Sequence, residues 1–197
     1  KNYAVTASKS GQLLDQVLQG ENNSEGRIAF FFMGHNDLCP SQNQQTTTDQ
    51  FLINYRTALR RWDTMHENST AVFIPVGDVH KVYKTLQGYV WYNDKERGRF
   101  RCEDSWERLF PYCPKFSHWQ QQGKLEGILG PMIAAMNAKL RELADEMNVR
   151  SRKNRYRFVQ YPHSIDFKPE YFSVDCFHMS QIGQQFIADV LYESNLY

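Results

Sequence analysis

The sequence predicts a three-layer α/β/α domain in which helices cover both faces of a mostly parallel, flavodoxin-like sheet. Short apolar runs at 27–33, 71–76 and 156–161 are typical of strands buried on both faces, as the strands of a parallel sheet are. Longer segments with apolar residues at helical spacing separate these runs, and this alternation requires right-handed crossovers on one sheet. A length of 197 residues and a hydrophobic content of 41% fit a single packed domain over 1–197.

The first helix and the first strand have clear end signals. Apolar residues form one stripe over 7–19, and Gly20 follows at the position where helices commonly end. The apolar run 27–33 closes at Gly34, which predicts a strand followed by a turn. The chain is therefore expected to start with a helix, a turn and a buried strand.

Three further helices are predicted from stripes of apolar residues. The second helix follows Thr46-Thr47-Thr48-Asp49, side chains that commonly begin helices, and the last helix has Ser180 as its expected N-cap. The stripes are Phe51, Tyr55, Leu59 and Trp62 in the second helix, Met132, Met136, Leu140, Leu143 and Met147 in the third, and Ile182, Phe186, Ile187 and Val190 in the last. The expected order of elements is α-β-α-β-α-β-α.

The stretch at about 89–123 does not fit this alternation. It is rich in aromatic, charged and turn-forming residues and carries two of the four cysteines. We expect an ordered loop insertion there, since loops of this length in compact domains are usually functional. Three of the four tryptophans, Trp91, Trp106 and Trp119, fall inside it and either line an apolar wall or simply pack the loop.

The charge balance excludes a strong overall attraction to nucleic acid or to an anionic membrane. The chain has 23 Lys and Arg against 22 Asp and Glu, a formal net charge of +1. One cluster of five cations in eight residues could contact phosphates, but its position after a helix C-terminus favours a solvated role that complements the helix dipole. The cluster comprises Arg150, Arg152, Lys153, Arg155 and Arg157. We therefore expect no nucleic-acid partner, and no apolar run reaches the ~20 residues of a transmembrane helix.

The cysteines favour two disulfides. The four cysteines include no Cys-x-x-Cys pair, which argues against a zinc or thioredoxin-type site; four reduced thiols are the alternative. Four cysteines allow three pairings, and the short separation of Cys102 and Cys113 favours a bond between them, which leaves Cys39 to Cys176.

Disulfides form in oxidising compartments. The sequons Asn22-Asn23-Ser24 and Asn68-Ser69-Thr70 are typical of secreted glycoproteins. We therefore expect a protein that is secreted or lies in another oxidising compartment.

Two polar segments lie where a parallel sheet binds ligands, near the carboxyl ends of its strands. Gly34-His35-Asn36-Asp37 follows the first strand directly, and Asp175-Cys176-Phe177-His178 precedes the last helix. An Asp three residues before a His on a turn can accept a hydrogen bond from the ring Nδ1–H and leave Nε2 as a general base. Each segment alone also fits an ordinary turn or a helix cap, but together they predict a catalytic site. No spacing typical of a metal site accompanies them.

Three segments of the chain carry a resemblance to one enzyme family. They are Asn2–Ser8, Met33–Cys39 and Phe172–Gly183, so the resemblance extends from one end of the chain nearly to the other. They resemble blocks of the SGNH or GDSL-type serine esterases and lipases, most closely those of the phospholipase B-like branch. The first is similar to a block that supplies a backbone oxyanion donor, with Ala7 in place of the usual glycine. The second resembles the block of the oxyanion-hole asparagine, and the third the block of the catalytic acid and base.

The resemblance implies a serine ester hydrolase that needs no metal or organic cofactor. It assigns His178 as the general base and Asp175 as the acid that orients it. It implies an oxyanion hole at Asn36 and Ala7, with Gly34 in the same block as Asn36. The implied substrates are lipid, phospholipid or other acyl esters.

The nucleophile block of that family, Gly-Asp-Ser at the end of the first strand, does not occur in this sequence. Gly77-Asp78-Val79 has valine at the nucleophile position and follows a different strand. The resemblance therefore implies the C-terminal portion of a hydrolase whose first strand and serine lie on an upstream segment. The alternative is a binding or scaffold protein that keeps the hydrolase fold without catalysis.

Overall fold

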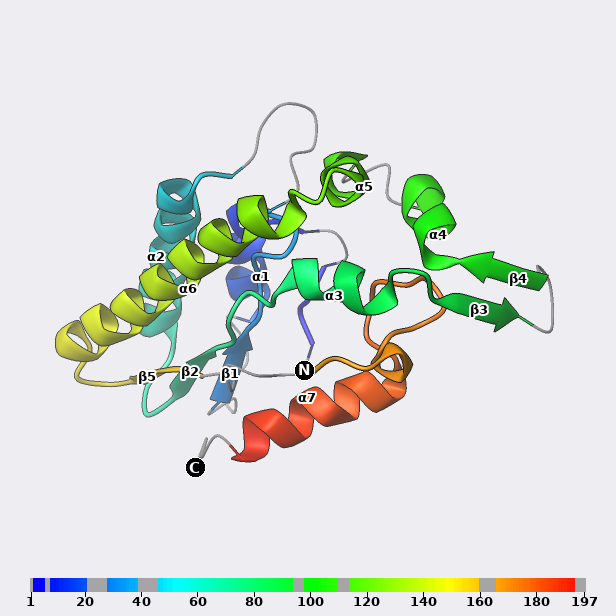
Figure 1. Cartoon of the computed structure of the whole chain (residues 1–197). Helices are drawn as coiled ribbons and strands as arrows, with labels where there is room; N and C mark the ends of the chain where they lie inside the picture. Colours follow the sequence, from blue (N-terminus) through cyan, green and yellow to red (C-terminus); the bar gives the residue numbers. More distant parts are fainter. Residues whose placement is uncertain are drawn as a thin grey trace. The chain divides into compact units, whose positions relative to one another are not determined.

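The structure is a computed structural model of the chain, and it describes residues 2–5, 8–20, 28–38, 46–93, 98–109, 114–159 and 166–193. Figure 1 shows the order of its elements along the chain. These elements are η1 (Ser10–Gln12), α1 (Leu13–Gln19), β1 (Ile28–Phe31), α2 (Thr48–Met65), β2 (Thr70–Phe73), α3 (Val79–Leu86), β3 (Val90–Asn93), β4 (Gly98–Arg101), α4 (Cys102–Leu109), α5 (Pro114–Gln121), α6 (Leu125–Arg150), β5 (Arg155–Phe158), η2 (Pro169–Tyr171) and α7 (Gln181–Glu193).

The chain divides into two compact units. Unit 1 comprises residues 1–38, 42–77 and 131–160, and unit 2 comprises residues 39–41, 78–130 and 161–197. Unit 1 contains β1, β2, β5, α1 and α2, whereas unit 2 contains α3, the β3–β4 hairpin, α4, α5 and α7. The helix α6 contributes residues to both units. The expected single domain over 1–197 stays a prediction.

Unit 1 is built on a parallel sheet whose strands follow the order β1-β2-β5. Phe31 pairs with Phe73 and Phe73 pairs with Phe158, so side chains from all three strands form one aromatic row on the same face. Each strand has four residues and overlaps one of the three apolar runs of the sequence. The predicted α/β class with a parallel sheet is confirmed, and it agrees with a three-layer α/β/α arrangement.

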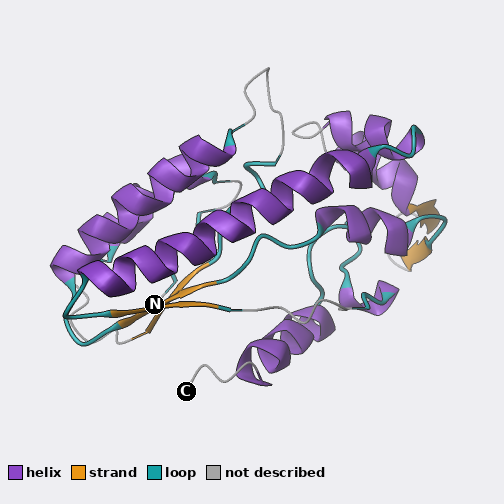
Figure 2. Cartoon of the chain, turned by 60° about the vertical axis from the view of Figure 1, so that its left-hand side comes forward, coloured by secondary structure: helices purple, strands orange, loops and turns teal. Residues whose placement is uncertain are grey.

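The helices α2 and α6 cover this aromatic face of the sheet (Figure 2). Tyr55 of α2 lies against Phe73 with ring centroids 6.3 Å apart. Asn137 of α6 bonds both backbone groups of Val76, accepting from its N–H at 2.8 Å and donating to its carbonyl at 2.9 Å. These contacts fix the residues that follow β2 at the carboxyl end of the sheet.

Two predicted helix starts are confirmed through their capping side chains. Thr47 precedes α2 and accepts a hydrogen bond from the Gln50 N–H at 3.1 Å. Ser180 precedes α7 and accepts a hydrogen bond from the Gly183 N–H at 3.1 Å. The side-chain oxygens thereby satisfy N–H groups that have no partner within the helix. The first helix also ends as predicted, since Gly20 follows α1.

The prediction of a loop over 89–123 is wrong, because most of the described residues in that stretch form the β3–β4 hairpin, α4 and α5. Aromatic side chains drive this packing. Tyr83 of α3 lies between Trp106 of α4, at a centroid distance of 4.4 Å, and Phe116 of α5, at 6.1 Å. All three side chains are buried, so Trp106 and Phe116 of this stretch pack with Tyr83 in the core of unit 2.

Candidate active site

A closed turn in unit 2 carries the predicted acid and base. Phe172 and Met179 form an antiparallel bridge, and the Ser173 N–H donates to the His178 carbonyl at 2.8 Å. Inside this closure, the Cys176 N–H donates to the Ser173 carbonyl at 2.9 Å. Residues 172–179, hereafter the dyad loop, lead directly into α7.

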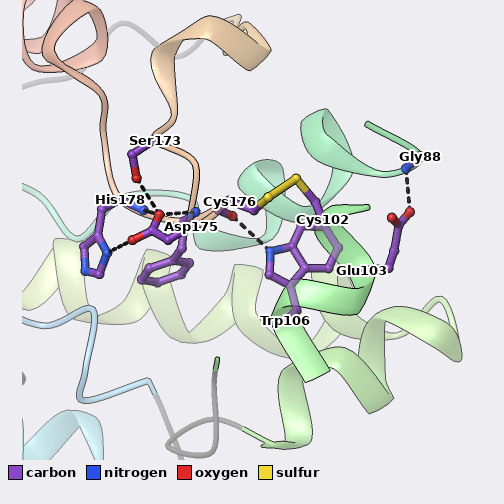
Figure 3. Close-up of a disulfide and its surroundings, with 9 residues drawn as sticks. Gly88, Cys102, Glu103, Trp106, Ser173, Asp175, Cys176 and His178 are labelled. Atoms are coloured by element: carbon purple, nitrogen blue, oxygen red, sulfur yellow. Dashed lines mark hydrogen bonds and ion pairs between the residues drawn. A yellow bond between two sulfur atoms is a disulfide. The ribbon is translucent and has the colours of Figure 1, made fainter. Parts of the chain in front are cut away.

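Asp175 and His178 form a hydrogen-bonded pair within the dyad loop (Figure 3). The Nδ1 atom of His178 lies 2.6 Å from Oδ2 of Asp175. A carboxylate at Nδ1 holds the neutral ring in the tautomer whose Nε2 is unprotonated. This hydrogen bond raises the pKa of His178 above its ordinary value, against the opposing effect of burial. The imidazole side chain is still 73% exposed, so solvent reaches the ring.

Asp175 is surrounded by hydrogen-bond donors. Its Oδ1 accepts from the Ser173 hydroxyl at 2.6 Å and from the N–H groups of Phe177 and His178, each at 3.0 Å. Burial alone would raise the pKa of Asp175, but the hydrogen bonds from His178, Ser173 and the backbone outweigh it and hold the pKa well below its usual range. Asp175 is therefore a carboxylate that can stabilise a protonated His178. Ser173 was not among the expected site residues; the general preference of Ser and Asp for turns was the only signal for it in the sequence.

Asn36 lies in unit 1, in the turn that follows β1. Gly34 makes this turn possible, because its φ is +133° and a Cβ on it would lie 2.5 Å from Cγ2 of Val76. The Asn36 side chain donates one Nδ2 hydrogen to the Ser8 carbonyl at 3.0 Å. An amide nitrogen has two hydrogens, so the second could be donated to an oxyanion.

The second expected oxyanion donor, Ala7, lies outside the described residues. Its neighbour Ser8 is described, and the hydrogen bond from Asn36 brings Ser8 beside the Asn36 turn. The structure thus brings Asp175 and His178 together in unit 2, and Asn36 and Ser8 together in unit 1. The roles of these residues in catalysis stay predictions.

The residues that flank Asn36 hold its turn in place. Asp37 is fully buried and accepts hydrogen bonds from both the N–H and the hydroxyl of Ser10, at 2.8 and 2.5 Å. His35 accepts a hydrogen bond at Nε2 from the Gly77 N–H at 2.9 Å. Burial lowers the pKa of His35 to about 4, so this ring is neutral at pH 7 and serves as an acceptor. Both residues act as hydrogen-bond acceptors, and their contacts fix the backbone on either side of Asn36.

The expected disulfide pairing is wrong. Cys102 bonds to Cys176, with their Cα atoms 5.5 Å apart, so neither Cys102–Cys113 nor Cys39–Cys176 forms. Cys102 begins α4, and a helix carries the chain about 10 Å away from its first residue over seven steps. Proximity in sequence is therefore a poor guide to the disulfide partner of a cysteine at the start of a helix. Cys39 and Cys113 themselves lie outside the described residues.

Other candidate sites of the sequence have ordinary explanations in the structure. In the basic cluster, Arg150 lies 3.2 Å from Glu146 and Lys153 lies 2.6 Å from Glu67, so both cations form ion pairs. The part of the chain that the structure describes contains no group of three or more His, Cys, Asp or Glu side chains placed to hold a metal ion. Among the same residues, no helix is long and apolar enough to cross a membrane.

Comparison of the chain with curated proteins found no match. A family model described as GDSL-like Lipase/Acylhydrolase matches residues 1–191. This match includes the Asn36 turn, the stretch 89–123 and the dyad loop. The chain therefore belongs to the family of GDSL-like lipases and acylhydrolases.

Proposed function

We propose that this chain supplies the base, the acid and the oxyanion donors of a serine ester hydrolase. A serine on an upstream segment attacks the ester carbonyl while Nε2 of His178 takes its proton. His178 then returns that proton to the leaving alcohol, and Asp175 stabilises the imidazolium between these two steps. Asn36 Nδ2 and the Ala7 N–H, with the N–H of the serine itself, stabilise the negative oxygen of the tetrahedral intermediate. Water then attacks the acyl-enzyme while His178 takes its proton, and His178 returns the proton to the serine oxygen as the carboxylic acid leaves.

The observation that carries this proposal is the 2.6 Å contact between Asp175 and Nδ1 of His178. It leaves Nε2 as the basic atom and places a carboxylate on the far side of the ring, which is the arrangement a general base needs. The pKa of Asp175 is held low, so the carboxylate stays ionised through the pH range in which His178 titrates. Membership in a family of lipases and acylhydrolases supports the same reaction class.

The proposed nucleophile lies upstream because the sequence contains no Gly-Asp-Ser. The edge of the sheet is suited to receive an additional strand. Among the described strands, β1 is hydrogen-bonded to β2 along one side and is the first strand in the order β1-β2-β5. A strand along the other edge of β1 would pair with its backbone and place a following serine at the carboxyl end of the sheet.

Lipid, phospholipid or other acyl esters are the proposed substrates, and an oxidising compartment or secretion is the proposed location. The Cys102–Cys176 disulfide fits such a compartment. The sequon residue Asn68 is exposed in the turn between α2 and β2, where an N-linked glycan can be accommodated.

The direct test is hydrolysis of p-nitrophenyl esters by the protein with its upstream segment, comparing His178→Ala with the wild type. We expect His178→Ala to abolish turnover without unfolding the chain, because the exposed ring fills no part of the core. His118→Ala is the matched control, since His118 is an exposed histidine on α5, and it should retain wild-type activity. Wild-type turnover by His178→Ala would reject the proposal, and an inactive wild type would favour a scaffold protein.

A further inference from the structure

The dyad loop is attached to α4 at two points, both on Cys176 (Figure 3). Cys102, the first residue of α4, forms a disulfide with Cys176. Trp106 donates its indole N–H to the Cys176 carbonyl at 2.9 Å. Residues four apart share one face of a helix, so both contacts come from the same side of α4. The disulfide and this hydrogen bond together are named the α4 anchor.

Cys176 has an unusual backbone conformation. Its φ is +61°, in the left-handed region that residues with a Cβ rarely occupy. Such a conformation persists where the surroundings hold it in place. The α4 anchor provides two such restraints, since the disulfide holds the Cys176 side chain and the indole holds the Cys176 carbonyl. Cys176 is also fully buried.

The Cys176–Phe177 peptide group connects the anchor to the catalytic carboxylate. Its carbonyl oxygen accepts from the Trp106 indole, while its N–H, on Phe177, donates to Oδ1 of Asp175 at 3.0 Å. In a planar trans peptide the carbonyl and the N–H point in opposite directions. The orientation that satisfies Trp106 on one side therefore fixes a donor to Asp175 on the other side.

The indole is itself fixed by packing within unit 2. Trp106 is 3% exposed, and its ring lies 4.4 Å from the ring of Tyr83 on α3, measured between centroids. A buried carbonyl that loses its donor is costly, so the peptide group would reorient to find another partner if the indole N–H were removed. That reorientation would take the Phe177 N–H away from Asp175.

We propose that Trp106, acting with the Cys102–Cys176 disulfide, is a positioning residue for acyl transfer. It fixes the Cys176–Phe177 peptide group. As a result, Oδ1 of Asp175 keeps its hydrogen bond from the backbone, and Oδ2 keeps its hydrogen bond with His178. This role rests on the proposed function of the Asp175–His178 pair. It also gives α4, which lies within the stretch 89–123, a part in arranging the catalytic groups.

The test compares Trp106→Phe with Trp119→Phe in the protein with its upstream segment. Phenylalanine keeps an aromatic ring against Tyr83 but has no N–H to donate. Trp119 lies on α5 against Phe116, with centroids 6.0 Å apart, and makes a matched control for the loss of one indole. A second variant, Cys102→Ser with Cys176→Ser, removes the covalent half of the anchor and retains Trp106.

We expect Trp106→Phe to lower kcat about tenfold with KM changed less than about twofold. The substitution disturbs the position of Asp175 relative to His178 and leaves the binding of substrate unchanged. The pKa of His178, followed by NMR of its ring signal, should fall by about 0.5 as Asp175 is held less well. The double serine variant should shift both quantities in the same direction. Trp119→Phe should change neither.

Two results would overturn the inference. One is a kcat and a His178 pKa in Trp106→Phe that equal those of Trp119→Phe. The other is a loss of activity that only follows the loss of folded protein, with the pH profile unchanged, because that would make Trp106 a structural residue. Failure of the proposed function is distinguishable, since it would appear as full activity in His178→Ala, whereas the NMR titration reports on the anchor without any substrate.

Discussion

Asp37 and Asp175 are two carboxylates in turns, one next to Asn36 and the other three residues before His178, and their hydrogen-bond partners differ. Asp37 is fully buried, and both of its oxygens accept hydrogen bonds from Ser10. Oδ1 of Asp175 accepts hydrogen bonds from the backbone and from Ser173, whereas Oδ2 is hydrogen-bonded to the titratable ring of His178. The partner of each carboxylate, more than its place in a motif, therefore distinguishes the structural role of Asp37 from the proposed catalytic role of Asp175.

The largest expected effect is that of Asp175→Asn on catalysis. The amide cannot stabilise an imidazolium, and it can bind the wrong tautomer of His178. We expect kcat for a p-nitrophenyl ester to fall by about 10³–10⁴ while the circular-dichroism melting curve changes little. A kcat within tenfold of the wild type would remove Asp175 from the mechanism.

Asn36→Ala should have the next largest effect. Loss of one oxyanion donor lowers kcat by about 10²–10³ with a smaller change in KM. Asn148→Ala is a useful control, because Asn148 bonds both backbone groups of Tyr156 and supports β5. That control should lower stability and leave kcat per folded molecule unchanged. An Asn36→Ala protein with normal kcat would mean that another group stabilises the oxyanion.

Asp37→Ala should act on stability first. The substitution leaves the buried Ser10 N–H and hydroxyl without their acceptor, which costs about 2–3 kcal/mol of unfolding free energy. Urea unfolding at pH 7 measures this loss, and the kcat of the remaining folded protein should stay far above that of Asp175→Asn. If Asp37→Ala were as stable as the wild type but as inactive as Asp175→Asn, the contrast between the two carboxylates would be wrong.

Local signals in the sequence predicted much of the fold. The three apolar runs became the parallel strands, Thr47 and Ser180 cap the helices that they were expected to begin, and Gly20 ends α1. These features depend on a few neighbouring residues, so a single sequence is enough to recognise them. The helix α3 was also within reach, since Val79, Val82, Tyr83 and Leu86 follow the helical spacing i, i+3, i+4, i+7.

Long-range features were beyond what the sequence could show. The pairing of Cys102 with Cys176 spans 74 residues and depends on where α4 packs, which no spacing rule specifies. The helices in 89–123 are short, and the packing of Trp106 and Phe116 around Tyr83 stabilises them. For the site, the motif predicted Asp175 and His178, but the support from Ser173 and Trp106 required the structure.

In the proposed reaction, His178, held by Asp175, activates a serine on an upstream segment. The most direct measurement is the rate at which a fluorophosphonate labels the protein with that segment, as a function of pH. Only neutral His178 can accept the serine proton, and its pKa is raised above the ordinary 6.5, so the labelling rate should rise with pH through a midpoint above 6.5. The label should lie on a Gly-Asp-Ser serine and be absent from His178→Ala. Labelling of a serine within residues 1–197, or equal labelling of His178→Ala, would contradict this account.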